Sequence, residues 1–298
     1  MKNKYFVSIV SVLIVGLLFV SLAASAETLF EKVKRKGIVV VGIANEKPFG
    51  YIDESGNVTG ESPEMARAVL KELGIEKMKP VVTKFGSLIP GMKAGRFDMI
   101  TAGAYITSDR EKEVDFAHPQ YKIGSGMAVK AGNPYDLHSY EDVAANPEVK
   151  IGIMAGAYEK KYAKAVGVKE KQIVSLPTNV AGIAALVAGR IDCLVATSIS
   201  IRDKVEMAAS PEIEVVEDFT DPVIGGTKVA GYASVAFPSD ADDFREAYNE
   251  KLEELRASGK LCEILTSFEL FSEANCVKDK LSVPEVLEAR KALEEAIG

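Results

Sequence analysis

The stretch Ala94-Gly95-Arg96-Phe97-Asp98 returns almost unchanged as Ala188-Gly189-Arg190-Ile191-Asp192. In both copies the glycine is typical of the end of a helix, and the apolar residue two positions later begins a run that predicts a buried strand. Two matching strings of five residues carry little weight alone. Because similar patterns flank both copies, we expect the chain to contain two similar α/β lobes.

The residues around each copy predict the same order of strands and helices. In the first half, the β-branched run 38–42 predicts a buried strand, and Ser62-Pro63 is a helix-start pattern in which Ser62 can cap the helix. Further strands are expected at 80–82 and 97–101 in the first half and at 149–153 and 173–176 in the second, with helices at 159–165 and 181–187. Alternating strands and helices imply parallel strands joined by crossover helices.

Two strand-like runs predict how the lobes are joined. They lie at 126–129 and 232–236, on either side of the second unit, so we expect the chain to cross between the lobes twice. The expected divisions are lobe one at 27–121 and 236–298, lobe two at 127–230, and hinge segments at 122–126 and 231–235. Such a two-strand hinge permits closure around a ligand, and the loops after the parallel strands should line the cleft.

The first 26 residues have the pattern of a signal peptide. Lys2 and Lys4 precede an apolar run at 5–20, and Ala24-Ser25-Ala26 has the small-x-small form of a cleavage site. An uncleaved membrane anchor is the alternative, because the run approaches a spanning length. We expect cleavage after Ala26 and an exported, soluble, periplasmic product.

Composition argues against several classes of function. The chain has 298 residues, of which 47% are hydrophobic and 27% charged, as is typical of a globular protein with about two domains. Its formal net charge of −7 argues against a nucleic-acid partner. Tryptophan is absent from the sequence, so an aromatic site must use Phe and Tyr. We expect a monomer.

The cysteines and histidines do not have the spacing of a metal site. His118 and His138 are far from the three cysteines in sequence, and we expect neither a metal nor a cofactor. Cys193 lies in an apolar run and is expected to be a buried thiol. Cys262 and Cys276 are close in the chain, but spacing does not fix geometry, so both the bridged and the free state stay open.

Residues with binding chemistry gather in the loops that follow the predicted strands. Lobe one offers three aromatic rings, an arginine and a carboxylate, whereas lobe two offers small residues, an amide and a hydroxyl. The candidate ligand-binding residues are Glu46, Phe49, Phe85, Tyr105, Thr107, Arg110, Gly156, Asn179 and Thr197.

Several of these residues lie in motifs of a known family. The chain resembles the extracellular solute-binding proteins of amino-acid-type ABC importers. The motifs are Pro48-Phe49-Gly50-Tyr51, the stretch 94–98, and Thr107-x-x-Arg110 followed by Val114-Asp115-Phe116. Within that family it is most similar to the ectoine- and hydroxyectoine-binding proteins, notably at 60–64 and 85–91. The resemblance implies a type II periplasmic-binding-protein fold, a small zwitterionic solute, and a membrane permease and ATPase as partners.

The resemblance also implies roles for individual residues. Arg110 would grip a ligand carboxylate with its planar fork of donors. Phe49, Phe85 and Tyr105 would surround a delocalised cation, and Glu46 would be the acidic partner of that cation. The alternatives are an arginine that pairs with a neighbouring glutamate, and aromatic rings that fill the core.

Two departures from the general amino-acid binders narrow the choice of ligand. Those proteins usually place an aspartate for the ligand ammonium where this chain has Thr197, and a Gly-Thr pair where it has Gly156-Ala157. Both changes favour a cyclic amidinium, and a polar amino acid or a related zwitterion is the alternative. An exported dehydratase on the same fold is a third possibility. Because no nucleophile or second acid accompanies Glu46, we expect no enzyme activity.

Overall fold

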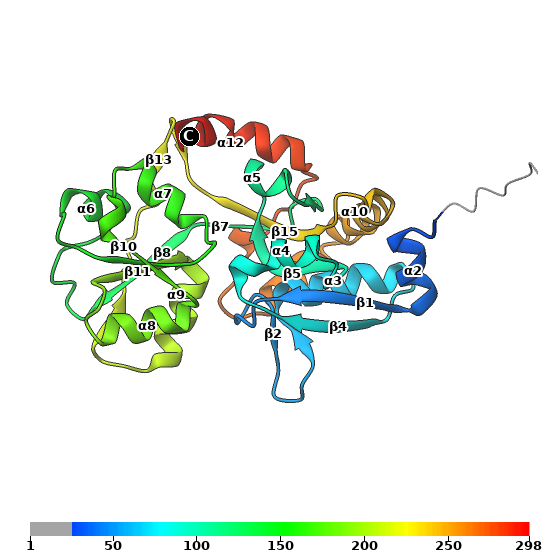
Figure 1. The fold of residues 1–298 in the computed structure, drawn as a ribbon, viewed down its shortest axis with the longest axis horizontal. Coiled ribbons are helices and arrows are strands. Elements are labelled where there is room, and N and C mark those ends of the chain that lie inside the picture. Colours follow the sequence, from blue (N-terminus) through cyan, green and yellow to red (C-terminus); the bar gives the residue numbers. More distant parts are fainter. Residues whose placement is uncertain (1–25, 298) are drawn as a thin grey trace, which may run out of the picture.

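The computed structural model describes residues 26–297, which form two α/β lobes side by side (Figure 1). The predicted signal segment 1–26, apart from Ala26, lies outside the described residues. Within residues 26–297, no helix is long and apolar enough to cross a membrane.

Lobe one is built on a six-stranded sheet. Its strands are β1 (Ile38–Ile43), β4 (Lys77–Val82), β5 (Met99–Tyr105), β6 (Asp115–Phe116), β7 (Tyr121–Ile123) and β15 (Gly231–Phe237), with a separate hairpin of β2 (Tyr51–Ile52) and β3 (Val58–Thr59). Its helices are α2 (Leu29–Lys36), α3 (Glu61–Glu72), η1 (Phe85–Ser87), α4 (Leu88–Lys93), α5 (Ser108–Glu111), α10 (Asp242–Ala257), α11 (Lys260–Thr266) and η3 (Glu273–Asn275). The strand order is β4-β1-β5-β15-β6, and β7 pairs with β15. The strand β1 is parallel to β4 and β5, whereas β15 is antiparallel to β5.

Lobe two repeats this arrangement in a five-stranded sheet. Its strands are β8 (Ser125–Lys130), β9 (Ile151–Met154), β10 (Ile173–Leu176), β11 (Cys193–Thr197) and β12 (Ile213–Val215), followed by the hairpin of β13 (Val223–Ile224) and β14 (Thr227–Lys228). Its helices are α6 (Tyr140–Ala145), α7 (Glu159–Ala165), η2 (Glu170–Gln172), α8 (Asn179–Val187) and α9 (Ser198–Ala208). The order β10-β9-β11-β8-β12 matches β4-β1-β5-β15 of lobe one, with β9 parallel to β10 and β11 and β8 antiparallel to β11. The two-lobed α/β fold is therefore confirmed.

The repeated five-residue stretch makes the same hydrogen bond in each lobe. The carboxylate of Asp98 accepts from the backbone N–H of Val40 in β1, at 2.8 Å. The carboxylate of Asp192 accepts from the backbone N–H of Lys150, beside the start of β9, also at 2.8 Å. The glycine of each copy has φ of 67°, the left-handed conformation that favours glycine at a helix end. Each copy therefore ends a helix and links the start of the next strand to the neighbouring parallel strand, β1 or β9.

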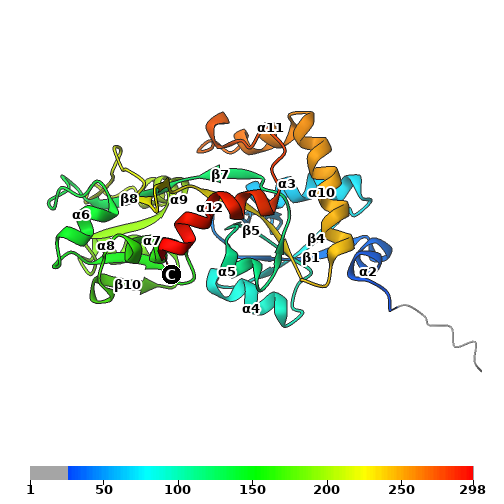
Figure 2. The same ribbon diagram turned by 90° about the horizontal axis from the view of Figure 1, so that it is seen from above.

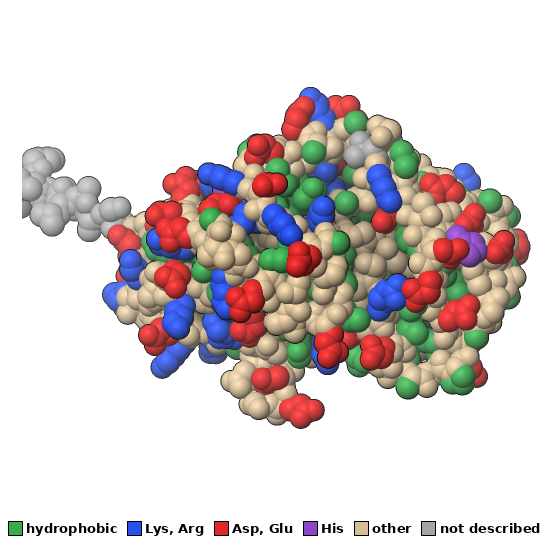
Figure 3. Space-filling view, turned by 180° about the vertical axis from the view of Figure 1, so that it is seen from behind, with side chains coloured by type: hydrophobic (Ala, Val, Ile, Leu, Met, Phe, Trp, Pro, Cys, Tyr) green, Lys and Arg blue, Asp and Glu red, His purple; other side chains and the backbone are tan. Residues whose placement is uncertain are grey.

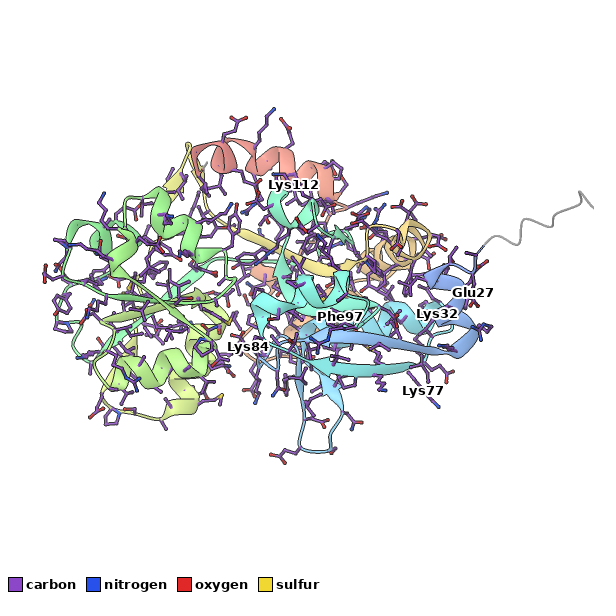
Figure 4. All side chains as sticks on the ribbon, viewed as in Figure 1. Glu27, Lys32, Lys77, Lys84, Phe97 and Lys112 are labelled. Atoms are coloured by element: carbon purple, nitrogen blue, oxygen red, sulfur yellow. A yellow bond between two sulfur atoms is a disulfide. The ribbon has the colours of Figure 1, made fainter. Side chains whose placement is uncertain are left out.

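The apolar residue of each copy covers a glycine of the central strand. Phe97, labelled in Figure 4, lies over Gly42 of β1, where an added Cβ would stand 2.6 Å from the ring. Ile191 covers Gly152 of β9 in the same way, and an added Cβ there would stand 2.5 Å from its Cδ1. The two strings thus form equivalent packing units, which accounts for their similarity.

The start of α3 differs from the predicted one. The helix begins at Glu61, and the hydroxyl of Ser62 is buried without a hydrogen-bond partner among residues 26–297. The backbone N–H groups of Glu61 and Ser62 donate instead to the carbonyl oxygens of Pro48, at 2.9 Å, and Phe49, at 3.1 Å. A loop distant in sequence therefore caps the helix, and the helix in turn holds the backbone of Phe49.

The two predicted hinge segments lie side by side. Tyr232 pairs with Lys122, and the flanking strands β7 and β15 are antiparallel within the sheet of lobe one. Lobe two begins at β8, directly after β7, and its last hairpin leads into β15. Adjacent crossings of this kind suit a hinge. The hinge role of 122–126 and 231–235 stays a prediction.

The C-terminal helix α12 (Val283–Ile297) departs from the predicted division of the chain. Its first turn is buried with the core of lobe one, whereas Arg290 donates to the hydroxyl of Tyr162 in lobe two. The assignment of all of 236–298 to lobe one is therefore corrected for α12, because its two ends bury against different lobes.

The cysteines occupy two different settings. Cys262 and Cys276 are joined by a disulfide with Cα atoms 5.5 Å apart, which ties α11 to the segment that precedes α12. Cys193 is a free thiol in β11, and burial raises its pKa. Among the described residues, no group of three His, Cys, Asp or Glu side chains is placed to hold a metal ion.

Charged side chains of both signs are intermixed on the face of the molecule shown in Figure 3. Lysines and arginines stand beside aspartates and glutamates over both lobes on that face, in keeping with the modest net charge. This face therefore lacks the concentrated basic area that a phosphate backbone requires.

Candidate ligand-binding site

A pocket that is partly open to solvent lies between the two lobes. Both lobes supply its lining at the carboxyl ends of their parallel strands, as expected for open α/β sheets. The lining residues are Glu46, Phe49, Phe85, Ala102, Gly103, Tyr105, Arg110, Met154, Ala157, Tyr158, Glu159, Asn179, Ala196 and Thr197.

Seven of the nine predicted site residues line this pocket, and Thr107 and Gly156 do not. Thr107 is buried behind the wall, where its hydroxyl caps α5 by accepting from the backbone N–H of Arg110, at 3.4 Å. Gly156 borders a neighbouring cavity and contributes its carbonyl oxygen to Arg110. Both residues therefore position the arginine from outside the lining. Their predicted contact with a ligand stays a prediction.

The guanidinium of Arg110 connects the two lobes at the pocket wall. Its Nη1 donates to the carbonyl oxygen of Tyr105, at 2.9 Å, and its Nη2 donates to that of Gly156, at 3.1 Å. Its central carbon lies 5.4 Å from the centre of the Phe85 ring, a cation–π arrangement. Desolvation lowers the pKa of Arg110, but an arginine remains charged at any ordinary pH.

The glutamates beside Arg110 in sequence have other partners. Glu113 pairs with Lys93, and a carboxylate oxygen of Glu111 accepts from the backbone N–H of Phe116, at 3.3 Å. The alternative of a simple surface ion pair for Arg110 is therefore not the arrangement in the structure. Because a guanidinium has five N–H donors, Arg110 retains donors for a ligand.

The aromatic residues of lobe one are held by different parts of the fold. The Phe49 ring is 6% exposed and packs edge-on against Phe271, with ring centres 6.1 Å apart. Tyr105 is 5% exposed, and its ring lies against Gly231, where an added Cβ would stand 2.1 Å away. Burial raises the pKa of the Tyr105 hydroxyl, which lacks a hydrogen-bond partner within residues 26–297.

Glu46 is held across the cleft by two side chains of lobe two. Asn179 Nδ2 donates to its Oε1 at 2.5 Å, and Ser200 Oγ donates to the same oxygen at 2.7 Å. Asn179 also donates to Ser200 Oγ, at 3.0 Å. Sequence reasoning missed Ser200, because it lies in the first turn of α9 and not in the preceding loop. Thr197, which was predicted, caps α9 by accepting from the backbone N–H of Ser200, at 3.2 Å.

Glu159 is a second carboxylate of the pocket that sequence reasoning also missed. It is 3% exposed, and burial raises its pKa to about 7, against the lowering influence of Arg110. The expectation that no second acid accompanies Glu46 is therefore wrong. Extending the loop after β9 past Gly156 and Ala157 would have included Glu159, since it begins α7.

We expect Glu159→Gln to remove a pH dependence of stability. With the pKa raised from its ordinary 4.5 to about 7, folded Glu159 keeps its proton while the unfolded chain releases it. The free energy of unfolding should therefore fall by about 3 kcal/mol as pH rises through this window, and the variant should lack this fall. Denaturant titrations of both proteins between pH 4.5 and 8 measure the difference. Identical pH profiles would contradict the burial of an acid at this site.

The neighbouring groups make that comparison specific. Arg110, Glu46 and Asp221 act on Glu159 through their charges and are unchanged in the variant. Glu111 also has a pKa raised to about 7 by burial, so a fall of the same sign should remain in both proteins. The difference between the two profiles therefore reports Glu159.

Neither His118 nor His138 lines the pocket. His118 contacts a carboxylate oxygen of Glu253 in α10, at 2.8 Å. His138 lies on the surface between Asp136 and Asp218, whose hydrogen bonds raise its pKa.

Further contacts hold the lobes closed around the pocket. Lys204 Nζ of α9 donates to the carbonyl oxygen of Lys47, at 2.7 Å, and Lys161 of α7 pairs with Asp109 of α5. Together with the contacts of Glu46 and Arg110, they join lobe one to lobe two on several sides. The structure is therefore a closed arrangement of the lobes.

Two α/β lobes joined by adjacent strands, with a pocket between them, define a two-lobed binding protein of the type II periplasmic fold. Residues 38–270 match the family model of the bacterial extracellular solute-binding proteins, family 3, and the chain belongs to that family. It is the solute-binding component of an amino-acid-type ABC importer, which implies a permease and an ATPase as partners.

The similar proteins include both a transporter binding protein and an enzyme. The chain is 38% identical over 259 residues to the "Probable amino-acid ABC transporter periplasmic-binding protein y4tE" of Sinorhizobium fredii, covering 86% of this chain and 85% of the relative. The solved structure of EhuB in complex with hydroxyectoine has a TM-score of 0.75 and 32% identity, covering 89% of this chain and 94% of EhuB. Cyclohexadienyl dehydratase of Pseudomonas aeruginosa is 26% identical over 196 residues, covering 64% of this chain and 72% of the enzyme.

Proposed function

We propose that this protein binds ectoine or hydroxyectoine between its lobes in the periplasm and delivers it to the permease of its importer. The observation that carries the proposal is that Arg110, Glu46 and three aromatic rings line the same pocket. A cyclic zwitterion with a carboxylate and a delocalised cation presents the complementary groups. The similarity to EhuB, solved with hydroxyectoine, supports the same choice.

The two ends of such a solute have different partners. Arg110 uses two donors on backbone carbonyls, so its remaining donors serve the carboxylate of the solute. The delocalised cation lies among Phe49, Phe85 and Tyr105, where each ring face contributes about 0.5–2 kcal/mol. Glu46 is its carboxylate partner.

The net charge of the pocket suits a zwitterion when Glu159 holds its proton. Glu46 and Arg110 then balance each other, and a solute without net charge enters a neutral pocket. The burial that raises the pKa of Glu159 to about 7 favours this protonated form.

Closure completes the site around the solute. Lobe one supplies Arg110, Glu46 and the aromatic rings, and lobe two adds the carbonyl of Gly156 and the side chains of Asn179 and Ser200. Each of these lobe-two groups touches a charged side chain that also faces the solute. Ligand binding on lobe one is thereby coupled to docking of lobe two.

A basic amino acid is the second candidate. When Glu159 is ionised, the pocket holds two carboxylates against one guanidinium, an imbalance that favours a solute with a net positive charge. A dehydratase activity is the third reading, because a dehydratase is among the relatives and the pocket contains two carboxylates. We propose no enzymatic role, since Glu46 is the partner of the solute cation and Glu159 is held in its protonated form by burial.

Isothermal titration calorimetry against a solute panel tests the proposal. The panel contains ectoine, hydroxyectoine, proline betaine, arginine, histidine and glutamine, each at pH 6 and pH 8. We expect tight binding of an ectoine and weaker or absent binding of the amino acids. Absence of heat with both ectoines, beside tight binding of an amino acid, would overturn the assignment.

Two controls sharpen this experiment. Phe49→Leu keeps an apolar side chain but removes a ring face, so it should weaken ectoine binding by about 0.5–2 kcal/mol. Incubation with prephenate tests the dehydratase reading. Turnover that disappears in Glu159→Gln would replace the binding-protein proposal with an enzyme.

A further inference from the structure

The helix α12 lies outside the matched family region, which ends at residue 270. Figure 2 shows α12 running from lobe one toward lobe two, across the side of the molecule where α5 and α7 approach each other. Lys112 of lobe one, labelled in Figure 4, lies beneath it. The helix therefore spans the two lobes beside the pocket.

The first half of α12 is fixed to lobe one. Val283 and Val286 are 6% and 1% exposed, and they belong to the apolar cluster that includes Leu88 and Phe116. The preceding segment is tied to α11 through the disulfide of Cys276. Apolar packing against lobe one and the nearby disulfide therefore hold the first half of α12 in place.

The second half of α12 is seated on lobe two through Arg290, which is 3% exposed. Its Nη1 donates to the carbonyl oxygen of Ala230, at 2.8 Å, and its Nη2 donates to the hydroxyl of Tyr162, at 3.1 Å. Its guanidinium also lies 5.4 Å from the centre of the Tyr158 ring, which lines the ligand pocket. Removing this buried guanidinium from its partners is costly.

A close backbone approach shows how tightly this half is seated. Gly225, in the turn between β13 and β14, lies against the helix, and an added Cβ would stand 2.3 Å from the carbonyl oxygen of Ala292. The contact of α12 with lobe two is therefore a packed surface and not a single hydrogen bond.

The same half of α12 also reaches the other pocket wall. The carboxylate of Glu294 accepts from the backbone N–H of Ser108, at 3.2 Å, in the first turn of the short helix that carries Arg110. Glu294 Oε1 lies 3.5 Å from Nε of Arg290. One pair of side chains thus connects the wall that contains Tyr158 with the wall that contains Arg110.

We propose that α12 is a strap anchored on lobe one and that Arg290 acts as a positioning residue. The contacts of Arg290 with lobe two keep a fraction of the ligand-free molecules in the closed arrangement. An opening movement separates lobe two from lobe one, so α12 must leave one of its seats. The first half of α12, which packs on lobe one, stays in place, and the contacts of Arg290 with lobe two are the ones that break. The strap thereby sets the free energy of closure, whatever solute the pocket binds.

Distances between two spin labels test the proposal on the full mature chain without ligand. Val82→Cys in lobe one and Val180→Cys in lobe two place the labels at positions 50% and 55% exposed, while Cys193 is buried and the other cysteines are bridged. Double electron–electron resonance then gives the ratio of open to closed molecules. We expect both populations in the otherwise unchanged protein, and Arg290→Ala to raise the open-to-closed ratio at least about fivefold.

Three further variants separate positioning from a loss of folding. Arg290→Lys keeps the charge and should restore part of the closed population, and Lys291→Ala, an exposed neighbour on α12, should leave the ratio unchanged. Glu294→Gln removes the carboxylate that lies 3.5 Å from Nε of Arg290. It should therefore shift the ratio in the same direction as Arg290→Ala, and it replaces that variant in the test if Arg290→Ala does not fold. An unchanged ratio in the folded variants, or no closed population in the parent, would overturn the strap. Because no ligand is used, this result is independent of the ectoine assignment.

Discussion

Arg110→Ala is expected to weaken solute binding by about 3 kcal/mol or more, which is more than about 100-fold. The substitution removes the proposed partner of the ligand carboxylate from the pocket. It also leaves the carbonyl oxygens of Tyr105 and Gly156 without their donor and removes a contact between the lobes. Calorimetry with the solute selected by the panel measures the loss.

Two variants control for charge and for general damage. Arg110→Lys keeps a positive charge without the planar fork, so its affinity should lie between those of the parent and the alanine variant. Arg96→Ala removes an exposed arginine of the same lobe and should bind as the parent does. Unchanged affinity in Arg110→Ala would remove this residue from the site and leave the carboxylate partner unassigned.

Gly86→Val is expected to weaken binding by about 1–3 kcal/mol, or about 5- to 150-fold, by keeping the lobes apart. An added Cβ on Gly86 would stand 3.1 Å from the carbonyl oxygen of Ala155 in lobe two, and the branches of valine reach further. From the opposite side, a Cβ on Gly156 would stand 2.6 Å from the Cα of Gly86. The substitution is therefore a wedge in the closed arrangement.

The wedge acts only between lobes, and this gives the experiment its control. The thermal unfolding midpoint of the ligand-free variant should match the parent, because the open form has room for valine. Gly86→Ala should cause a smaller loss of affinity than Gly86→Val. Parent-like affinity in both variants would mean that binding does not require the close approach of Gly86 and Gly156.

Local sequence was sufficient to predict the main elements and much of the pocket. Runs of β-branched residues and glycines at helix ends predicted where the loops after the parallel strands lie. Seven of the residues in those loops line the pocket. Glu159 and Ser200 were missed, because each lies in the first turn of a helix. Glu159 lines the pocket and Ser200 donates to Glu46 of its lining, and both positions depend on the angle at which the helix packs. Hydrophobic periodicity predicts which helix or strand a residue belongs to, but it does not predict how that element is oriented toward the cleft.

The start of α3 is a second case in which tertiary contacts overrode a local pattern. Ser62 followed by Pro63 is a good capping sequence, yet the carbonyls of Pro48 and Phe49 satisfy the first N–H groups of the helix. Helix termini accept any suitable partner for their free N–H groups, and here a distant loop supplies it.

The repeated stretches 94–98 and 188–192, together with the similar patterns on both sides of them, predicted the two-lobed architecture. Each encodes a helix end, a buried strand and a carboxylate that bonds the neighbouring strand, and these are short-range features. Tertiary structure alone decided the partners across the cleft: Glu46 with Asn179, Arg110 with Gly156, and α12 with both lobes. Those contacts join residues far apart in the chain, so their geometry depends on how the two lobes are packed, which no local pattern specifies.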